Sequence, residues 1–477
     1  MAMDRHHAGR LRAVSNQLFA GPDRVRLRGA CFTPLEPIHS GEEWTGGFGR
    51  EAETLSLLLQ AQAMGLNALR VYLPPPKWFL DCCAELGFFI FVDLSWNSQS
   101  DFLSTTTARQ RIEHSVLTRL RGLGKHEAVA GIFIGNELPA DLVRWHGAKR
   151  CSGFLDDLIR KAREEWEEPL YGYAGYPPSD SVAPNEADFC ALNLYPKDRE
   201  ALRHFLQRAM QWAGERPFIV SEVGEDVRSQ GEKAQAEMLM AISKEAERAG
   251  NAGFFWFSLT DRWWRSGRRV EGWEFGLLDH NGRPRPASAL LQASVDAAES
   301  SPSVTVVVCV RDGARSIEAC LSALLRMTYS NLEVLVIDDG SRDETPALVE
   351  SFARRDGRMR LVRQEPLGLS AARNRGVSEA KGEIVAFTDA DCCVDPGWAS
   401  QLVMRFKEGP WAGVGGFNLS PDPVNWQQAC VASAPGGAWH VMLDDEEAEH
   451  LPGCNMAFRK EVFEQVGGFE PLFKTAG

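Results

Sequence analysis

Two glutamates follow short apolar runs in the first half of the chain, and their carboxyl groups could share acid–base and nucleophilic chemistry. Glu137 comes after the run 131–134, and Glu222 comes after the run 217–220. Cleavage of a glycosidic bond with retention needs two carboxyl groups about 5 Å apart, one protonated as an acid and one ionised as a nucleophile. Glutamates so distant in sequence can form this pair only if the fold brings both strand ends to one opening.

Two aspartate motifs hold comparable positions in the last third of the chain. Asp338 and Asp339 follow the run 332–337, and Asp389 and Asp391 follow the run 383–387. Such carboxylates suit a reaction in which a nucleoside diphosphate leaves a sugar, because a divalent cation must offset the diphosphate charge and hard cations take carboxylate oxygens. One aspartate of the later pair can serve the cation and the other the sugar or ribose. An aspartate of the earlier pair can accept from a base N–H or a ribose hydroxyl.

The elements around the two glutamates predict a barrel of parallel strands. Apolar runs alternate with amphipathic helical stretches between residues 15 and 298, and parallel strands require such crossover helices. Active sites of (β/α)8 barrels lie at the C-terminal strand ends, where Glu137 would close the fourth strand and Glu222 the seventh. The expected strands are 25–31, 68–72, 88–92, 131–134, 170–173, 189–193, 217–220 and 253–257.

The sequences around both glutamates resemble segments of a known group of enzymes. The stretch from His126 to Glu137, which ends in Gly135-Asn136-Glu137, is similar to the acid/base segment of glycoside hydrolases of the clan of families 2 and 5. Phe218-Ile219-Val220-Ser221-Glu222 is similar to the nucleophile strand of that clan. The resemblance implies a retaining barrel with Glu137 as acid/base and Glu222 as nucleophile. It further implies a substrate-binding role for Arg70, for Asn136 on the sugar 2-hydroxyl, for Asn193, for Tyr195 beside the nucleophile, and for Trp256 as an aromatic floor.

Other residues after the predicted strands allow two interpretations. Asp93 and Trp96 follow the third strand, and Trp263 and Trp264 follow the eighth. They could line a glycan groove, because aromatic faces stack on sugar rings. The tryptophan pair is equally consistent with a packed loop.

A second module begins after a short linker. Residues 299–303 are small, polar and interrupted by proline, which predicts a boundary. The continuous β-branched run 304–310 is typical of a central parallel strand, and further strands are expected at 332–337, 359–363 and 383–387. Alternation with helices predicts a doubly wound sheet whose ligands bind beyond the C-terminal strand ends.

The motif series of this module resembles the family 2 inverting glycosyltransferases. The series comprises Asp338-Asp339-Gly340-Ser341, the segment 368–374, Thr388-Asp389-Ala390-Asp391 and the segment 453–459. The resemblance implies a GT-A fold, a nucleotide-diphospho-sugar donor, an oligo- or polysaccharide acceptor and Mg²⁺ or Mn²⁺. It assigns nucleotide binding to Asp338, Asp339 and Asp389, the metal to Asp391, the donor region to Arg373 and the acceptor region to Asn455. Relatives carry their general base after the position of Phe473, so the module at 304–477 is expected to be incomplete at its C-terminus.

Composition limits the partners and the compartment. The net charge of −13 argues against nucleic acid. The 11 cysteines show no metal-binding spacing, which predicts reduced thiols and a cytoplasmic protein. The apolar runs are shorter than the roughly 18 residues of a membrane span, so no span is expected in this chain; membrane association is expected only if the protein continues.

The sequence therefore predicts an α/β protein with two enzymatic modules. A (β/α)8 TIM barrel at 15–298 would trim or remodel a glycan, and a GT-A domain at 304–477 would transfer sugar to one. Hydrolysis and transglycosylation use the same two glutamates and are not separated by the sequence. Two alternatives remain: a barrel that only binds glycan, and an inactive transferase module beside an active glycosidase.

Overall fold

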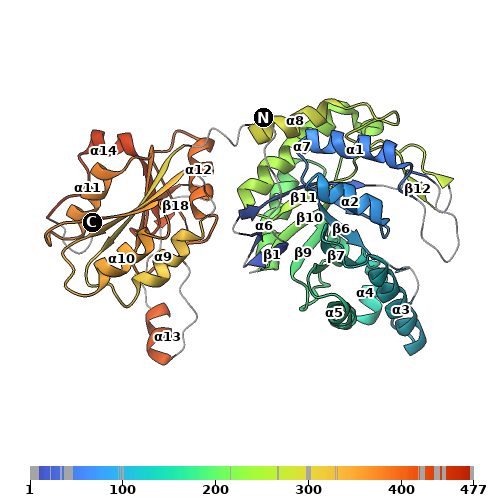
Figure 1. Cartoon of the computed structure of the whole chain (residues 1–477), viewed down its shortest axis with the longest axis horizontal. Coiled ribbons are helices and arrows are strands. Elements are labelled where there is room, and N and C mark those ends of the chain that lie inside the picture. Colours follow the sequence, from blue (N-terminus) through green and yellow to red (C-terminus); the bar gives the residue numbers. More distant parts are fainter. Residues whose placement is uncertain are drawn as a thin grey trace. The chain divides into compact units, whose positions relative to one another are not determined.

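The computed structural model divides the chain into two compact units, Met1–Glu299 and Ser300–Gly477, and each is considered by itself (Figure 1). The structure describes residues 10–472 except 15, 22, 33–34, 37–46, 95, 97, 99–100, 215, 266–267, 297–301, 328, 330, 417, 419–424, 434–440 and 443–446. Most of the predicted linker, 299–303, lies outside the described residues.

The first unit is a closed barrel of eight parallel strands, which confirms the predicted fold. The strands close in the order β10-β11-β4-β5-β6-β7-β8-β9, so chain order is kept around the barrel. In chain order they are β4 (Leu27–Phe32), β5 (Ala68–Val71), β6 (Phe89–Asp93), β7 (Val129–Asn136), β8 (Leu170–Gly175), β9 (Phe189–Asn193), β10 (Phe218–Val223) and β11 (Gly253–Trp256).

Helices connect successive strands on the outside of the barrel. Two of these helices have a side-chain N-cap: Thr105 accepts from Ala108 N at the start of α3, and Asp198 accepts from Ala201 N at the start of α6. The helices are α1 (Glu51–Ala63), α2 (Lys77–Glu85), α3 (Thr106–Gly122), α4 (Ala140–His146), α5 (Ala148–Glu165), η1 (Pro177–Ser179), α6 (Arg199–Ala213), α7 (Val227–Ala249) and α8 (Pro286–Asp296).

Phenylalanine rings fill the inside of the barrel. The Phe91 ring lies 6.0 Å from that of Phe133 and 5.2 Å from that of Phe255, centroid to centroid. Neighbouring strands make room with glycine: a Cβ on Gly131 would lie 2.4 Å from the Phe91 ring, and one on Gly29 would lie 2.3 Å from Phe255. The interior is therefore a packed core that supports the strand ends.

A three-stranded antiparallel sheet precedes the barrel and was not predicted. It consists of β1 (Leu11–Val14), β2 (Gln17–Ala20) and β3 (Asp23–Val25). Its apolar side chains belong to the same buried cluster as the interior phenylalanines. Gln17 donates to Gly250 O just before β11, so the sheet covers the N-terminal end of the barrel and leaves the opposite end for the site.

The second unit is built on a six-stranded sheet in the order β16-β15-β14-β17-β21-β18. The first four strands are parallel, whereas β21 is antiparallel to both neighbours, as in a Rossmann-like GT-A domain with a mixed edge. The strands are β14 (Val304–Val310), β15 (Leu332–Asp338), β16 (Met359–Arg363), β17 (Ile384–Asp389), β18 (Gly413–Gly415) and β21 (Met456–Arg459).

Helices cover both faces of this sheet. In Figure 1, α9 and α10 lie on one side and α11 and α14 on the other, and successive residues of β14 enter two separate buried clusters accordingly. The helices are α9 (Ile317–Leu325), α10 (Thr345–Ala353), α11 (Leu369–Glu379), α12 (Trp398–Glu408), α13 (Trp426–Ser433) and α14 (Lys460–Val466).

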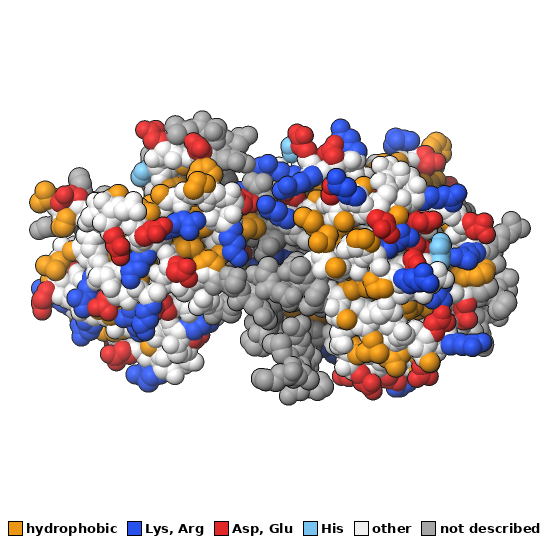
Figure 2. All heavy atoms as spheres, turned by 90° about the horizontal axis from the view of Figure 1, so that it is seen from above, with side chains coloured by type: hydrophobic (Ala, Val, Ile, Leu, Met, Phe, Trp, Pro, Cys, Tyr) orange, Lys and Arg blue, Asp and Glu red, His pale blue; other side chains and the backbone are white. Residues whose placement is uncertain are grey.

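Each unit also carries a small two-stranded antiparallel hairpin, and the surface bears charges of both signs. The hairpins are β12 (Trp264–Arg265) with β13 (Arg268–Arg269), and β19 (Val441–Met442) with β20 (Ala448–His450). Acidic and basic side chains are interspersed over the face seen in Figure 2. Within the described residues, no helix combines the length and the apolar character that crossing a bilayer requires.

Candidate active sites of the two units

A buried arginine organises the C-terminal end of the barrel. Arg70 on β5 is fully buried, and its Nη2 donates to Asp93 Oδ2 at 2.7 Å while its Nη1 donates to Glu222 Oε1 at 2.9 Å. The guanidinium also donates to Asn136 Oδ1 at 3.0 Å and to Asn193 Oδ1 at 3.3 Å. Three other predicted site residues, Glu222, Asn136 and Asn193, therefore meet around this cation, together with Asp93.

Glu222 at the end of β10 is held by three donors. Besides Arg70, the hydroxyl of Tyr72 donates to Oε1 at 2.7 Å and that of Tyr195 donates to Oε2 at 2.9 Å. Burial raises the pKa of the Glu222 carboxyl, whereas Arg70 and the two tyrosines oppose that shift and Glu137 adds to it. The carboxylate is thus fixed in orientation, and its donors favour the ionised form.

Glu137 follows β7 and faces the same opening. Asn193 Nδ2 donates to Glu137 Oε1 at 2.8 Å and to Asn136 Oδ1 at 3.1 Å. Glu137 has a φ of 47°, and its N–H donates to Ala174 O at 2.8 Å, which holds this uncommon backbone conformation. Strained residues of this kind cluster at functional sites. A chain of contacts through Asn193 and Arg70 links Glu137 to Glu222.

The structure corrects the prediction for Trp256. Trp256 is fully buried in the cluster between strands and helices, and its Nε1 donates to Phe275 O at 3.0 Å. The next residue, Phe257, joins the interior cluster instead. Successive residues of a strand face opposite sides, so the prediction chose the correct strand end and the wrong face.

Tyr72 was missed although its position carried a signal. Arg70 faces the barrel interior, and a residue two positions later on a strand points the same way. Tyr72 accordingly reaches Glu222, and the Arg70 guanidinium lies between the rings of Tyr72, at 4.9 Å, and Phe133, at 4.5 Å. Tyr72 is the last residue of the predicted strand 68–72, so a search for polar side chains on the same face of the strand as Arg70 would have found it.

The structure places the residues that could have lined a glycan groove in different surroundings. Asp93 is buried against Arg70 and lines no groove. Trp96 packs 4.8 Å from the Phe102 ring and donates to Ile134 O at 3.1 Å, so it supports β7. Trp263 joins a group of aromatic side chains beside Tyr72 and Phe257, and Trp264 begins the β12–β13 hairpin.

In the second unit, Asp338 and Asp339 end β15 as predicted but bind their own chain. Asp338 is fully buried and accepts from Ser341 N at 3.0 Å and from Arg363 Nε at 2.9 Å. Its carboxylate therefore supports the turn after β15, whereas the sequence predicted a nucleotide-binding role for it.

Asp339 ties a loop to the sheet. Its carboxylate accepts from Gln364 Nε2 at 2.7 Å, from Leu367 N at 2.9 Å and from Gly368 N at 2.9 Å. Both oxygens are engaged and the residue is 5% exposed. The structure thus gives Asp339 a positioning role for residues 364–368.

Asp389 and Asp391, which follow β17, are more exposed to solvent than Asp338 and Asp339. Asp391 is exposed, and the side chain of Asp389 is 44% exposed, 3.8 Å from Arg373 Nη2. Burial raises the pKa of Asp389, and Arg373 opposes the shift. Arg373 also donates to Gly453 O at 3.4 Å, and Asn455 accepts from Trp398 Nε1 at 2.8 Å. The predicted donor and acceptor residues therefore converge at this end of β17.

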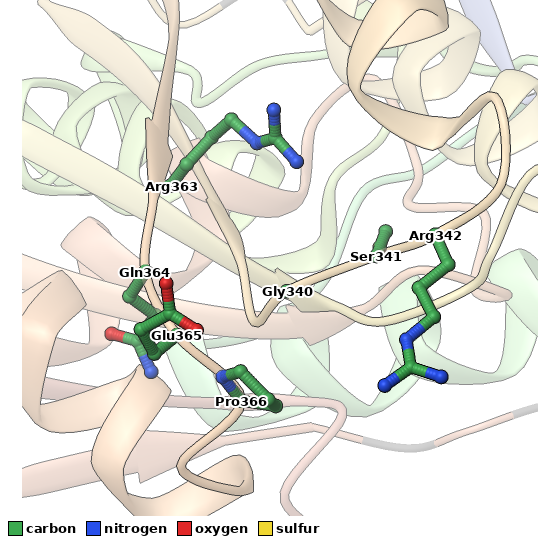
Figure 3. A pocket seen from close by; sticks show the side chains of 7 residues that line it. All are labelled: Gly340, Ser341, Arg342, Arg363, Gln364, Glu365 and Pro366. Atoms are coloured by element: carbon green, nitrogen blue, oxygen red, sulfur yellow. The ribbon is translucent and has the colours of Figure 1, made fainter.

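A polar hollow of about 630 Å³ lies beside the ends of β15 and β16 (Figure 3). In the close-up, Arg342 and Arg363 stand on different segments of its rim. Its lining residues are Gly340, Ser341, Arg342, Arg363, Gln364, Glu365 and Pro366. The loop held by Asp339 thus forms one wall of the hollow.

The aspartates suit a cation that is shared with phosphate. Within the described ranges, no three His, Cys, Asp or Glu side chains form a complete metal site. Hard cations such as Mg²⁺ use one or two carboxylates and complete their shell with phosphate and water. Asp389 and Asp391, with open carboxylates at one strand end, fit this donor set.

Known proteins similar to part of the chain are named as glycosyltransferases. "Putative glycosyltransferase EpsH" of Bacillus subtilis (strain 168) is 36% identical over 103 residues, 22% of this chain and 30% of that protein. "Glycosyltransferase AglE" of Haloferax volcanii is 39% identical over 171 residues, 35% of this chain and 56% of that protein. The alignments thus cover about a third to about half of these two relatives.

A solved structure similar to this chain is "Faecalibacterium prausnitzii Beta-glucuronidase", with a TM-score of 0.49 and 16% identity over 60% of this chain and 52% of that one. The barrel fold itself rests on the strand pairing given above. The family model "Glycosyl transferase family 2" matches residues 305–467. The second unit of the chain therefore contains a domain of glycosyl transferase family 2.

Proposed function

We propose that the chain joins two sugar chemistries, with a retaining glycosidase or transglycosylase barrel preceding a nucleotide-sugar-dependent transferase domain. The observation that carries the barrel half is the contact chain Glu222–Arg70–Asn193–Glu137, which holds two carboxyl groups at one opening. The transferase half rests on the family match together with the open aspartates after β17.

In the barrel, Glu222 attacks the anomeric carbon and Glu137 protonates the departing oxygen. Tyr72, Tyr195 and Arg70 aim the attacking carboxylate, because they donate to both of its oxygens. Glu137 then removes a proton from water or from a sugar hydroxyl, and the oxygen of that acceptor bonds to the anomeric carbon as the ester bond to Glu222 breaks. Water gives hydrolysis and a sugar hydroxyl gives transglycosylation.

In the transferase domain, the donor lies across the C-terminal ends of β15 and β17. The hollow beside Arg342 and Arg363 would receive the nucleoside part. Asp391 and Asp389 would hold a divalent cation, which would offset the charge of the diphosphate. Arg373 orients the donor by its charge near Asp389. Asn455, fixed by Trp398, lies on the acceptor side.

The barrel half is tested by hydrolysis of a panel of aryl β-glycosides. Wild type is expected to release nitrophenol, and Glu222→Ala and Glu137→Ala are expected to lose this activity. Azide should restore turnover in Glu222→Ala by replacing the missing nucleophile. Unchanged hydrolysis in both variants would exclude this pair, and no hydrolysis or transfer with any glycoside would favour a barrel that only binds glycan.

The transferase half is tested by calorimetric titration with UDP, GDP and dTDP, each with and without Mn²⁺. We expect one nucleotide to bind only with Mn²⁺, and Asp391→Ala to weaken this Mn²⁺-dependent binding. Asp395→Ala is the matched control, because Asp395 is an exposed acid on the same loop. Equal binding by wild type and Asp391→Ala would contradict the assignment.

A further inference from the structure

Six aromatic side chains form a continuous wall at the mouth of the barrel. The Phe257 ring lies 5.1 Å from Trp263 and 6.3 Å from Trp273, and the Trp263 and Trp273 rings lie 5.8 Å apart. The wall continues through ring contacts of Tyr72 with Trp263 and of Tyr195 with Phe257 and Phe275. The members of this aromatic wall are Tyr72, Tyr195, Phe257, Trp263, Trp273 and Phe275.

The wall lies on the nucleophile side of the opening. Its two tyrosines donate to the two oxygens of Glu222, whereas Glu137 is contacted by the amide of Asn193. Trp273 is in ring contact with Phe257, Trp263 and Phe275, and not with either tyrosine, in the described part of the chain. By these contacts Trp273 stands one ring farther from Glu222 than Phe257, Trp263 and Phe275, which each touch one of the two tyrosines.

Trp273 is exposed yet firmly held. Its side chain is 41% exposed, and Tyr195 is 48% exposed. The neighbouring residue Glu274 donates its N–H to Asp226 Oδ1 at 3.0 Å and accepts at its carbonyl from Val227 N at 2.9 Å. Exposed aromatic faces on a fixed backbone are typical of binding surfaces.

We propose that Trp273 is the platform of a second sugar subsite, next to the sugar bound over Glu222. The inference rests on the proposed glycosidase function and specifies its substrate class: a glycan chain that continues at least one residue beyond the cleaved residue on the nucleophile side. Sugar rings present apolar faces that stack on tryptophan. An oligosaccharide that occupies both subsites would lie along the aromatic wall from Tyr195 to Trp273.

Binding of chains of different length tests this subsite without relying on turnover. The Glu137→Gln protein is applied to an array of β-linked glucan, mannan, galactan, xylan and uronan oligosaccharides of one to six residues. We expect binding from two residues upward, and Trp273→Ala in the same background should weaken it about tenfold. Trp273→Phe should retain most of the affinity, and Trp426→Ala, which removes an exposed tryptophan of the other unit, should change nothing.

The outcomes separate the subsite from the catalytic proposal. Binding that does not rise from one to two residues, or equal weakening by Trp273→Ala at every length, would overturn the subsite, as would no binding to any oligosaccharide. Length-dependent binding through Trp273 by a protein that neither hydrolyses nor transfers any glycoside would support the subsite and overturn the catalytic proposal.

Discussion

At the residue scale, Arg70 determines the barrel site because its charge is fully buried. Removing one partner of a buried ion pair leaves a charge without compensation and costs about 3–5 kcal/mol. We expect Arg70→Met, which frees Asp93 and Glu222 at once, to abolish hydrolysis and to lower the free energy of unfolding by an amount in that range, measured by urea denaturation. Arg160→Met removes an exposed ion pair and should leave both quantities unchanged; the prediction is wrong if the two variants behave alike.

The tyrosine hydroxyls should control the acidic limb of the pH profile. Both bonds lower the pKa of Glu222 against the effect of burial. Tyr195→Phe or Tyr72→Phe should therefore raise that pKa, and because the nucleophile must be ionised, the acidic limb of kcat/KM should move to higher pH. Tyr171→Phe, which removes a buried hydroxyl bonded to Trp166 O, should leave the limb in place. A shift to lower pH would contradict the assignment of Glu222.

The two glutamates were predicted from residue types in context, and the family resemblance supplied Arg70 and Asn193; strand geometry explains the exceptions. Glu137, Glu222, Arg70 and Asn193 follow strands or end them, so their convergence was predictable once the barrel was assumed. The prediction for Trp256 was wrong because adjacent residues of a strand point to opposite faces, and Trp256 points away from the barrel interior. The burial of Asp338 depends on partners such as Arg363, 25 positions later, which local sequence does not reveal.

At the element scale, the barrel depends on glycines that admit interior rings. Gly131→Ala would place a Cβ 2.4 Å from the Phe91 ring, and overpacking of this kind costs about 1–3 kcal/mol. Gly122→Ala, at the end of α3, meets no atom within 4 Å and should be neutral or slightly stabilising. Thermal denaturation of both variants distinguishes these effects; equal melting temperatures would disprove the packing argument.

The loop 364–368 should loosen when its anchor is removed. Asp339 accepts from the amides of Leu367 and Gly368, so Asp339→Ala should accelerate hydrogen exchange at these amides and weaken nucleotide binding. Asp391→Ala should weaken Mn²⁺-dependent binding without changing exchange in the loop. Unchanged exchange in Asp339→Ala would show that the loop is held by other contacts.

Elements with strong periodicity were predictable, and short edge elements were not. The eight barrel strands and the run 304–310 have long apolar patterns, and each falls within a few residues of the observed strand. The sheet β1–β3 has strands of three or four residues, too short to show a period. Its position depends on packing beneath the barrel, which is a tertiary effect.

At the scale of the whole molecule, the two units should unfold separately. The buried apolar clusters of the described residues each lie within one unit. Calorimetry of the full chain should therefore show two transitions. The nucleotide that binds with Mn²⁺ should raise only one of them, and Gly131→Ala should lower only the other. A single transition that responds to both changes would show that the units are thermodynamically coupled.

The arrangement of Arg70 between Asp93 and Glu222 has a consequence for the proposed covalent intermediate. Before reaction, one buried cation faces two carboxylates, so the trio carries an excess negative charge beside the ring of Phe133. When Glu222 becomes a sugar ester, it gives up its charge and leaves Arg70 and Asp93 as a balanced pair. A protein interior tolerates a balanced pair far better than an unmatched ion. The barrel would thus relieve its own electrostatic imbalance by acquiring the sugar.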